Sequence, residues 1–218
     1  MANIESPMQS YYAARAPEYD NVYLKPERQA DIQRLRDWLP PIFADTRVLE
    51  IACGTGFWTQ FIAPEASEMV AIDTSPETMA IAERRVPRGN VTFLIGDAYR
   101  LPIQFGRFDA AFAGFWFSHI PKSRQLAFLS GLSQVLNPGA TVLLLDNLYV
   151  AGSSSSITEQ DSEGNTYQSR KLGDGSTHRV LKNFPTEVEL LALTVGLGSR
   201  AVYTRFEYYW AFQYASEP

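Results

Sequence analysis

The residues with the clearest chemical pattern form a short run in the first third of the chain, Glu50-Ile51-Ala52-Cys53-Gly54-Thr55-Gly56. An apolar, β-branched segment (47–52) leads into this run and predicts a buried strand that ends at a turn. Glycines at such a turn let the backbone bend sharply and approach a ligand closely, because a Cβ would intrude. The pattern therefore predicts a ligand-binding loop after a strand.

Two acidic residues follow at the ends of the next two predicted strands. Asp73 closes MVAID, 19 positions after Gly54, and Asp97 closes VTFLIGD. A carboxylate at the first position can accept hydrogen bonds from both ribose hydroxyls of a nucleoside. Asp97 can accept from an adenine amine, and the amide of Ala98 can donate to a ring nitrogen. Three successive strands thus end in residues suited to one adenosine.

The elements that must position these residues alternate in type. Strands are predicted at 47–52, 69–73, 91–97, 108–115 and 141–148, and helices at 26–39, 57–66, 76–85 and 123–136. Ser75 is the expected N-cap of the third helix and Pro76 its first residue. Apolar strands separated by helices predict an α/β fold, with a parallel sheet covered on both faces.

The last third of the chain departs from this alternation. The polar stretch 151–165 predicts a mobile loop, and the segments 166–172 and 178–184 flank GDGST as a β-hairpin. A helix over 185–197 and aromatic strands over 199–215 complete the chain. With no repeat and no boundary signal, one domain is expected over 1–218, made of a lid (1–40), a core (41–150) and a cap (151–218).

Composition excludes several classes of protein. The chain has 218 residues and a formal charge of −5, which fits poorly with binding to nucleic acid through its phosphates. Its only cysteine, Cys53, cannot form an intrachain disulfide, and two histidines without ligand spacing predict no metal site. The longest apolar run, 110–117, is shorter than the roughly 20 residues of a membrane helix. We therefore expect a cytoplasmic protein without a membrane partner.

The motifs VLEIACGTG, AID, GDA and FDAAFAGF, in this order and spacing, resemble those of class I S-adenosylmethionine-dependent methyltransferases over about residues 11–148. The resemblance implies a Rossmann-like, seven-stranded, mostly parallel sheet with an antiparallel edge strand. It also implies S-adenosyl-L-methionine as cofactor and S-adenosyl-L-homocysteine as product. The cofactor contacts expected from the motifs and their flanks are Tyr11, Glu50, Ala52, Gly54, Gly56, Trp58, Asp73, Thr74, Met79, Asp97, Ala98 and Phe115.

A narrower likeness covers YYAARAPEYD, GTGFWT, FWFSHIP and KLGDGSTHRVLKNFPTEVEL. These segments are similar to small-molecule O-methyltransferases of natural-product pathways, phosphonate O-methyltransferases included. The likeness implies in-line transfer of a methyl group to an oxygen of a small anionic or hydroxylated acceptor. It also implies an N-terminal helical lid and a C-terminal hairpin cap.

The expected acceptor-binding residues are tyrosines of the N-terminal segment and cations of the hairpin, namely Tyr12, Tyr19, Tyr23, Arg170, Arg179 and Lys182. Alternating strand positions share a face, so Arg170 and one of the later cations could converge on an anion. The alternative is a solvated hairpin whose cations keep a sheet edge from aggregating. The tyrosines either close over the ligands or pack a helix on the sheet edge.

His119, after the fourth predicted strand, is the candidate catalytic residue because imidazole titrates near neutrality. It is either a general base or a hydrogen-bonded residue of the cleft wall, since an anionic acceptor needs no base. N-methyl transfer, a non-catalytic cofactor-binding subunit and an NAD-dependent oxidoreductase stay open as other functions. Against the last, Thr59 stands where a third glycine would seat a pyrophosphate. The chain is expected to be a monomer or homodimer.

Overall fold

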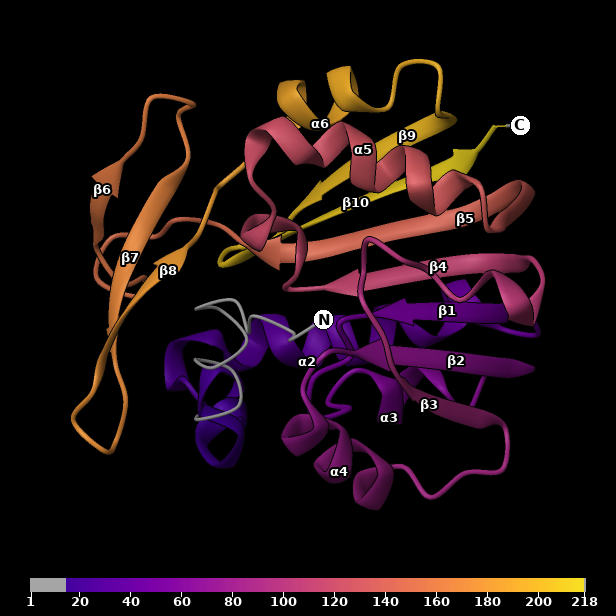
Figure 1. The fold of residues 1–218 in the computed structure, drawn as a ribbon, viewed down its shortest axis with the longest axis horizontal. Helices are drawn as coiled ribbons and strands as arrows, with labels where there is room; N and C mark the ends of the chain where they lie inside the picture. Colours follow the sequence, from indigo (N-terminus) through magenta and orange to yellow (C-terminus); the bar gives the residue numbers. More distant parts are fainter. Residues whose placement is uncertain (1–14, 218) are drawn as a thin grey trace, which may run out of the picture.

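The computed structural model describes residues 15–217, and its central feature is a seven-stranded sheet of order β3-β2-β1-β4-β5-β10-β9 (Figure 1). Strands β1 to β5 are parallel, whereas β10 runs antiparallel to both β5 and β9. The strands are β1 (Arg47–Ile51), β2 (Glu68–Asp73), β3 (Val91–Ile95), β4 (Phe108–Gly114), β5 (Leu136–Asn147), β9 (Gly198–Arg205) and β10 (Tyr209–Ser216). The chain order reverses between β1 and β4, where open α/β sheets bind ligands.

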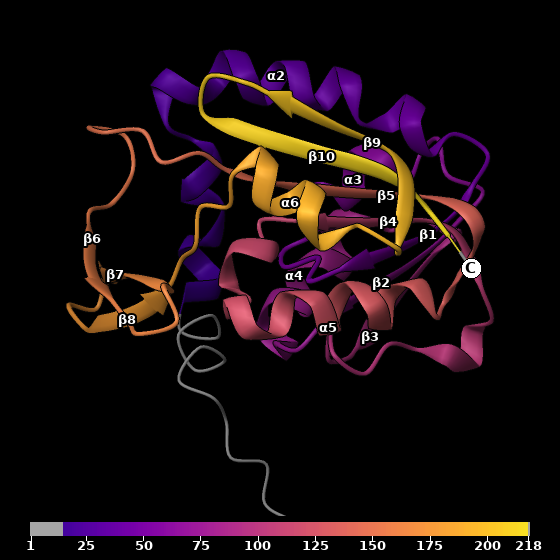
Figure 2. The ribbon, with the colours of Figure 1, turned by 90° about the horizontal axis from the view of Figure 1, so that it is seen from above.

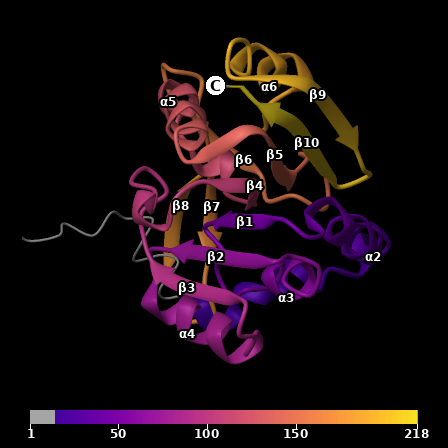
Figure 3. The ribbon, with the colours of Figure 1, turned by 90° about the vertical axis from the view of Figure 1, so that its right-hand side faces the viewer.

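Helices cover both faces of this sheet, as expected for apolar parallel strands (Figure 3). One face packs on α2 (Gln29–Trp38), α3 (Thr59–Ile62) and α4 (Pro76–Arg85), through side chains such as Leu35, Ile62 and Met79. The other face packs on α5 (Lys122–Ser133) and α6 (Glu187–Leu193), through Leu129 and Leu190. The prediction of an α/β fold is confirmed.

Local signals in the sequence explain where two helices begin. The Ser75 side chain accepts a hydrogen bond from the Thr78 amide and Pro76 opens α4, as predicted. At α6, Thr186 and Glu189 form a reciprocal capping box. The helix expected over 26–39 begins instead as a 3-10 turn, η2 (Pro26–Arg28), before continuing as α2.

A second, three-stranded antiparallel sheet consists of β6 (Ile157–Gln160), β7 (Thr166–Lys171) and β8 (Thr177–Leu181). The predicted hairpin is confirmed as β7 and β8. The loop predicted over 151–165 is wrong in part, since residues 157–160 form β6 and pair with β7. The sequence does not indicate this strand, because an exposed edge strand made of polar residues has no apolar pattern. The helix predicted over 123–136 ends earlier, at Ser133, and the strand predicted over 141–148 begins earlier, at Leu136.

The small sheet lies beyond the carboxyl ends of the parallel strands, next to the N-terminal segment (Figures 1 and 2). It is tied to the main sheet through the 3-10 turn η5 (Phe117–His119) that follows β4. The backbone amide of Asn183 donates to the Ser118 carbonyl oxygen at 2.8 Å. The Asn183 side-chain nitrogen donates to the Ile120 carbonyl oxygen at 3.0 Å. This end of the molecule therefore joins the hairpin, η5 and the turn η1 (Ala16–Tyr23).

Candidate active site

The loop after β1 adopts the backbone that its glycines allow. Ala52, Gly54 and Gly56 all have positive φ angles, of 55°, 56° and 72°. A Cβ at Gly56 would lie 3.1 Å from Ala82 of α4, and one at Gly54 would lie 3.1 Å from the Tyr19 ring. The glycines therefore let this loop pack closely between α4 and η1.

Asp73, at the end of β2, is the centre of a hydrogen-bond network that includes this loop. Its carboxylate accepts from the Gly54 amide and the Ser75 amide, each at 2.9 Å. Burial raises the pKa of Asp73, against the lowering effect of these donors. Together with Thr74 and Thr78, Asp73 lines a cleft at the carboxyl ends of the strands.

The other wall of this cleft, where the cofactor expected from the sequence would bind, comes from the ends of β3 and β4. Asp97 and Ala98 line it on one side, Phe115 and Trp116 on the other. Phe115 has a φ of 58°, and its amide donates to the Leu145 carbonyl oxygen at 2.7 Å. Ala52 and Phe115 thus hold a backbone conformation that is strained for residues with side chains, at the ends of two adjacent strands, as found at functional sites.

Three predicted cofactor contacts lie behind the loop instead of on the cleft wall. Glu50 is buried and accepts a hydrogen bond from Thr59 Oγ1 at 2.6 Å, and burial raises its pKa to about 8. Trp58 packs among apolar side chains that include those of α2, and Met79, on α4, packs against Cys53 and Ala71. In this structure they support the loop. Tyr11 and Tyr12 lie outside the described residues.

His119 lies where the cleft meets the small sheet, as the last residue of η5. Its Nδ1 is 2.6 Å from the Leu181 carbonyl oxygen, which can only accept, so Nδ1 carries the proton. Burial, with the positive charges of Lys182 and Arg170, holds the pKa of His119 well below its usual range. The ring is therefore neutral at physiological pH and is oriented by β8.

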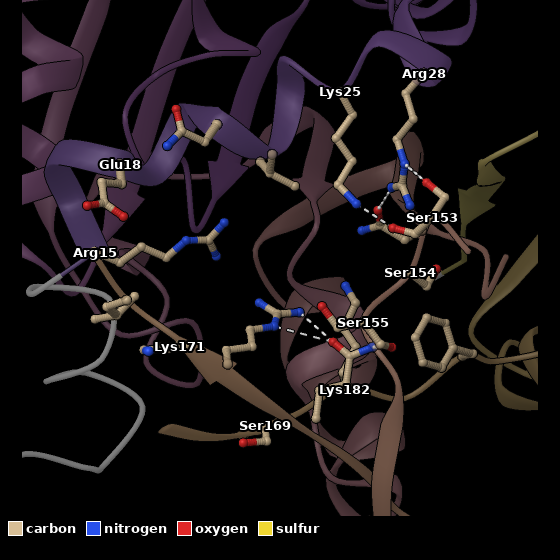
Figure 4. Close-up of a pocket in the computed structure, with 17 residues that line it drawn as sticks. Arg15, Glu18, Lys25, Arg28, Ser153, Ser154, Ser155, Ser169, Lys171 and Lys182 are labelled. Atoms are coloured by element: carbon tan, nitrogen blue, oxygen red, sulfur yellow. Dashed lines mark hydrogen bonds between the residues drawn. The ribbon is translucent and has the colours of Figure 1, made fainter. Parts of the chain in front are cut away.

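On the far side of η5 lies a larger cavity of about 360 Å³, between η1, η2, the end of β5 and the small sheet (Figure 4). Its lining is strongly cationic, whereas Glu18 is its only carboxylate among the described residues. The basic residues of this lining are Arg15, Lys25, Arg28, Arg170, Lys171 and Lys182. A cavity of this size and charge suits a small anionic molecule.

Lys182 connects the cationic cavity to the buried end of β5. It is 3% exposed, and its Nζ donates to Asp146 Oδ1 at 2.7 Å and to Ser118 Oγ at 2.6 Å. Burial, together with the charges of Arg170 and Arg15, lowers the pKa of Lys182 to about 8 despite the attraction of Asp146. The Lys182 ammonium in turn lowers the pKa of Asp146, against the effect of burial.

The structure separates the other predicted acceptor residues. Arg170 lines the cationic cavity and donates to the Gln168 side-chain oxygen at 2.9 Å. Arg179 does not: it is exposed, pairs with Glu159 at 2.7 Å and stacks over Tyr167 on the outside of the sheet. Alternation along the two strands places Arg170 and Arg179 on opposite faces, and the ion pair with Glu159 holds Arg179 away from the cavity.

The predicted tyrosines also divide. Tyr19 lines the cofactor cleft rather than the cationic cavity. Tyr23 is 4% exposed and stacks on Phe57 with ring centroids 3.6 Å apart, as part of the core. Sequence reasoning did not identify Lys25 and Arg28 as site residues, because they lie in an ordinary amphipathic stretch. No local signal distinguishes them from solvated cations.

Comparison with known proteins agrees with the site and the fold. Residues 48–139 match the family model described as a methyltransferase domain. Demethylmenaquinone methyltransferase of Lactiplantibacillus plantarum is 27% identical over an alignment of 152 residues, and the match covers 64% of this chain and 62% of that protein. The biotin biosynthesis bifunctional protein BioHC of Cellvibrio japonicus is 30% identical over 59% of this chain and 24% of its own length. The chain thus spans less than two thirds of these curated relatives.

The likeness to solved structures extends over nearly the whole chain. A DhpI–SAH complex superposes with a TM-score of 0.79 at 28% identity, covering 97% of this chain and 96% of that one. Together with the strand order and the cleft at its switch point, these findings support a class I S-adenosylmethionine-dependent methyltransferase.

Within that class the chain resembles the DhpI phosphonate methyltransferase. A second DhpI structure, a complex with SAM and HEP, superposes with a TM-score of 0.78 at 29% identity and covers 95% of both chains. The likeness includes the small sheet, because so high a coverage leaves no large segment unmatched.

Two further observations concern the described residues alone. None of their helices is long and apolar enough to cross a membrane. Between residues 15 and 217, no group of three or more histidine, cysteine, aspartate or glutamate side chains is placed to hold a metal ion.

Proposed function

We propose that this chain transfers the methyl group of S-adenosyl-L-methionine to an oxygen of a small anionic metabolite. The observation that carries the proposal is the cationic cavity beside the cofactor cleft. The two are separated by η5, where His119 lines the cleft and bonds to Leu181, while the next residue, Lys182, lines the cavity. An acceptor held by Lys182 and Arg170 would therefore lie next to the cofactor.

The residues of the cleft fit this cofactor. Asp73 and Asp97 provide carboxylates for the ribose hydroxyls and the adenine amine, and the small Ala98 leaves room for the base. The Tyr19 ring lies against Gly54, where an aromatic face can attract the sulfonium cation. None of these residues would seat a pyrophosphate.

When bound, the cofactor supplies a methyl group made electrophilic by its positive sulfur. The protein's residues then have to hold the acceptor in line and exclude water, which is worth effective molarities of about 10⁵–10⁸ M in well-oriented systems. Lys182 and Arg170 would hold the anionic group by charge-assisted hydrogen bonds. An anionic oxygen has no proton to lose, so neutral His119 would form part of the cleft wall without removing a proton.

The DhpI complex with SAM and HEP supports this proposal, since the similarity extends over the hairpin that carries Arg170 and Lys182. The likeness to demethylmenaquinone methyltransferase is lower in coverage, at 64% of this chain and 62% of that protein.

The first test is calorimetric titration of the purified chain with S-adenosylmethionine, S-adenosylhomocysteine and NAD. We expect both sulfur nucleosides to bind and NAD to bind much more weakly. Methyl transfer from labelled S-adenosylmethionine to phosphonates, carboxylates, phenols and amines then tests the acceptor class. Turnover of amines or neutral phenols, with none of the anions, would contradict the proposal.

The hairpin provides a matched pair of variants for the acceptor site. Arg170→Ala should raise the KM of an anionic acceptor at least tenfold, because it removes a cation from the cavity, and should leave the affinity for S-adenosylhomocysteine unchanged. Arg179→Ala removes the same charge from the opposite face and should behave like the wild type. Equal effects of the two substitutions would place the acceptor elsewhere.

A further inference from the structure

Arg28 is a buried cation at the end of the cationic cavity away from Lys182. It is 3% exposed, and its guanidinium donates to Ser153 Oγ at 2.9 Å and to Asn147 Oδ1 at 2.7 Å. Both acceptors are neutral, and no carboxylate of the described residues lies within ion-pair distance of Arg28. Buried charges are ordinarily paired, so this site has positive charge without a directly bonded anion.

Lys25 lies beside Arg28 and adds a second positive charge. Its Nζ donates to the backbone oxygen of Ser153, and Figure 4 shows both side chains extending from the N-terminal segment toward that serine. Burial lowers the pKa of Lys25, and the positive charges of Arg28 and Arg170 lower it further. The two cations therefore repel each other and Arg170, and an anion bound between them would relieve that repulsion.

The acidic residues nearby leave this charge largely uncompensated. Glu27 accepts a hydrogen bond from the Ser153 hydroxyl at 2.7 Å, and its negative charge raises the pKa of Lys25 and so offsets part of the repulsion, but Glu27 is exposed to solvent. Glu18 lies against the hairpin turn, where a Cβ at Gly173 would collide with its carboxylate. Neither carboxylate bonds directly to Lys25 or Arg28.

The two cationic ends of the cavity are linked through adjacent residues of β5. Asp146 bonds to Lys182, and Asn147 bonds to Arg28. The Asn147 side-chain nitrogen also donates to Asp146 Oδ1 at 3.1 Å, so the two cationic ends are anchored to side chains that bond to each other. A small molecule can therefore contact both.

We propose that Lys25 and Arg28, both held in place by Ser153, form a second anion subsite, so that the preferred acceptor carries two anionic groups. The group to be methylated would lie at Arg170 and Lys182, beside the cofactor cleft. The other, a carboxylate or a phosphate-like group, would lie at Lys25 and Arg28. This inference rests on the proposed function, which it refines by adding a second recognition element to the acceptor.

Two probes that differ in one group test the subsite, namely propylphosphonate and 3-phosphonopropionate. They are titrated calorimetrically into the chain saturated with S-adenosylhomocysteine, so that the readout does not depend on turnover. The wild type should bind the two-anion probe at least tenfold more tightly. Lys25→Met should reduce that preference to about twofold or less, with little change in the affinity for propylphosphonate.

Two further variants complete the design. Lys25→Arg should restore most of the preference, because it keeps the charge. Arg84→Met, which removes an exposed cation from α4, should retain it in full. Arg28→Gln should act as Lys25→Met does, provided that circular dichroism shows a native fold.

The outcomes separate the two proposals. If both probes bind equally to the wild type, or if Lys25→Met keeps the tenfold preference, the second subsite is wrong while the proposed function stands. If neither probe binds and no anion is methylated, the proposed function itself is wrong.

Discussion

Single carboxylates and cations have distinct tasks at the two halves of the site. Asp73 accepts backbone hydrogen bonds from the glycine loop and from the start of α4, so it positions both elements. Lys182 is a buried ammonium whose charge depends on the balance between burial and Asp146. We expect substitution of Asp73 to change cofactor affinity and substitution of Lys182 to change acceptor affinity.

Asp73→Asn should weaken the binding of S-adenosylhomocysteine roughly ten- to hundredfold, as expected from the loss of hydrogen bonds to a charged group worth about 1.5–3 kcal/mol. The amide that replaces one oxygen would also face the backbone donors of Gly54 or Ser75. Calorimetry measures the affinity. Asp109→Asn, at the exposed start of β4, is the control and should bind normally.

The KM of an anionic acceptor should rise as pH rises through about 8, since the pKa of Lys182 lies there and the neutral amine loses its attraction for an anion. Below that pH the ammonium is present and binding is strong. Steady-state kinetics between pH 6.5 and 9.5 measure this dependence. S-adenosylhomocysteine affinity, measured over the same range, is the control. A flat KM profile would show that Lys182 keeps its proton or does not hold the acceptor.

At the scale of elements, η1 packs on the glycine loop and on α4. It contacts the glycine loop through Tyr19 and through Asp20, which accepts a hydrogen bond from Thr55 Oγ1 at 2.6 Å. Arg85 of α4 joins them by pairing with Asp20 and by donating to the Thr55 carbonyl oxygen at 2.9 Å. These contacts hold η1 over the cofactor cleft.

Arg85→Met should release this attachment and speed the dissociation of S-adenosylhomocysteine several-fold. The pair is half-exposed, so its loss should cost no more than about 1 kcal/mol of folding free energy. Stopped-flow fluorescence measures the dissociation rate. The adjacent and exposed Arg84→Met should leave it unchanged, and equal rates in the two variants would mean that η1 does not limit release.

The whole molecule is acidic, with a formal charge of −5, yet the cavity beside the cofactor cleft is cationic. The excess of acidic residues is therefore borne by other surfaces, and the positive potential is concentrated where the acceptor is expected to enter. Such a local field attracts anions at low ionic strength and is screened as salt is added.

Accordingly, kcat/KM for an anionic acceptor should fall several-fold between about 0.01 and 0.15 M salt, as the Debye length shortens from about 30 to 8 Å. The dependence comes from the cationic lining of the cavity. Lys25→Met should show a shallower slope than the wild type, whereas Arg84→Met should match it. Identical slopes for all three proteins would argue against an electrostatic contribution from Lys25.

The sequence by itself was sufficient for the α/β fold and for placing two carboxylates at one edge of the sheet. Apolar strands predict a parallel sheet, and Asp73 and Asp97 follow neighbouring strands whose ends meet at that edge. Local chemistry also predicted the start of α4 at Ser75 and the hairpin, because caps and turns depend on neighbours in the chain.

Only the tertiary structure could assign the cationic cavity. Lys25 and Arg28 lie more than 150 residues before Lys182 in the sequence, and nothing local marks these two cations as its neighbours. Which of Arg170 and Arg179 faces inward depends on how the small sheet packs against η5, and whether Tyr23 is core or cleft depends on its stacking with Phe57. Burial and long-range charge are properties of the packed chain, so the structure alone placed these side chains.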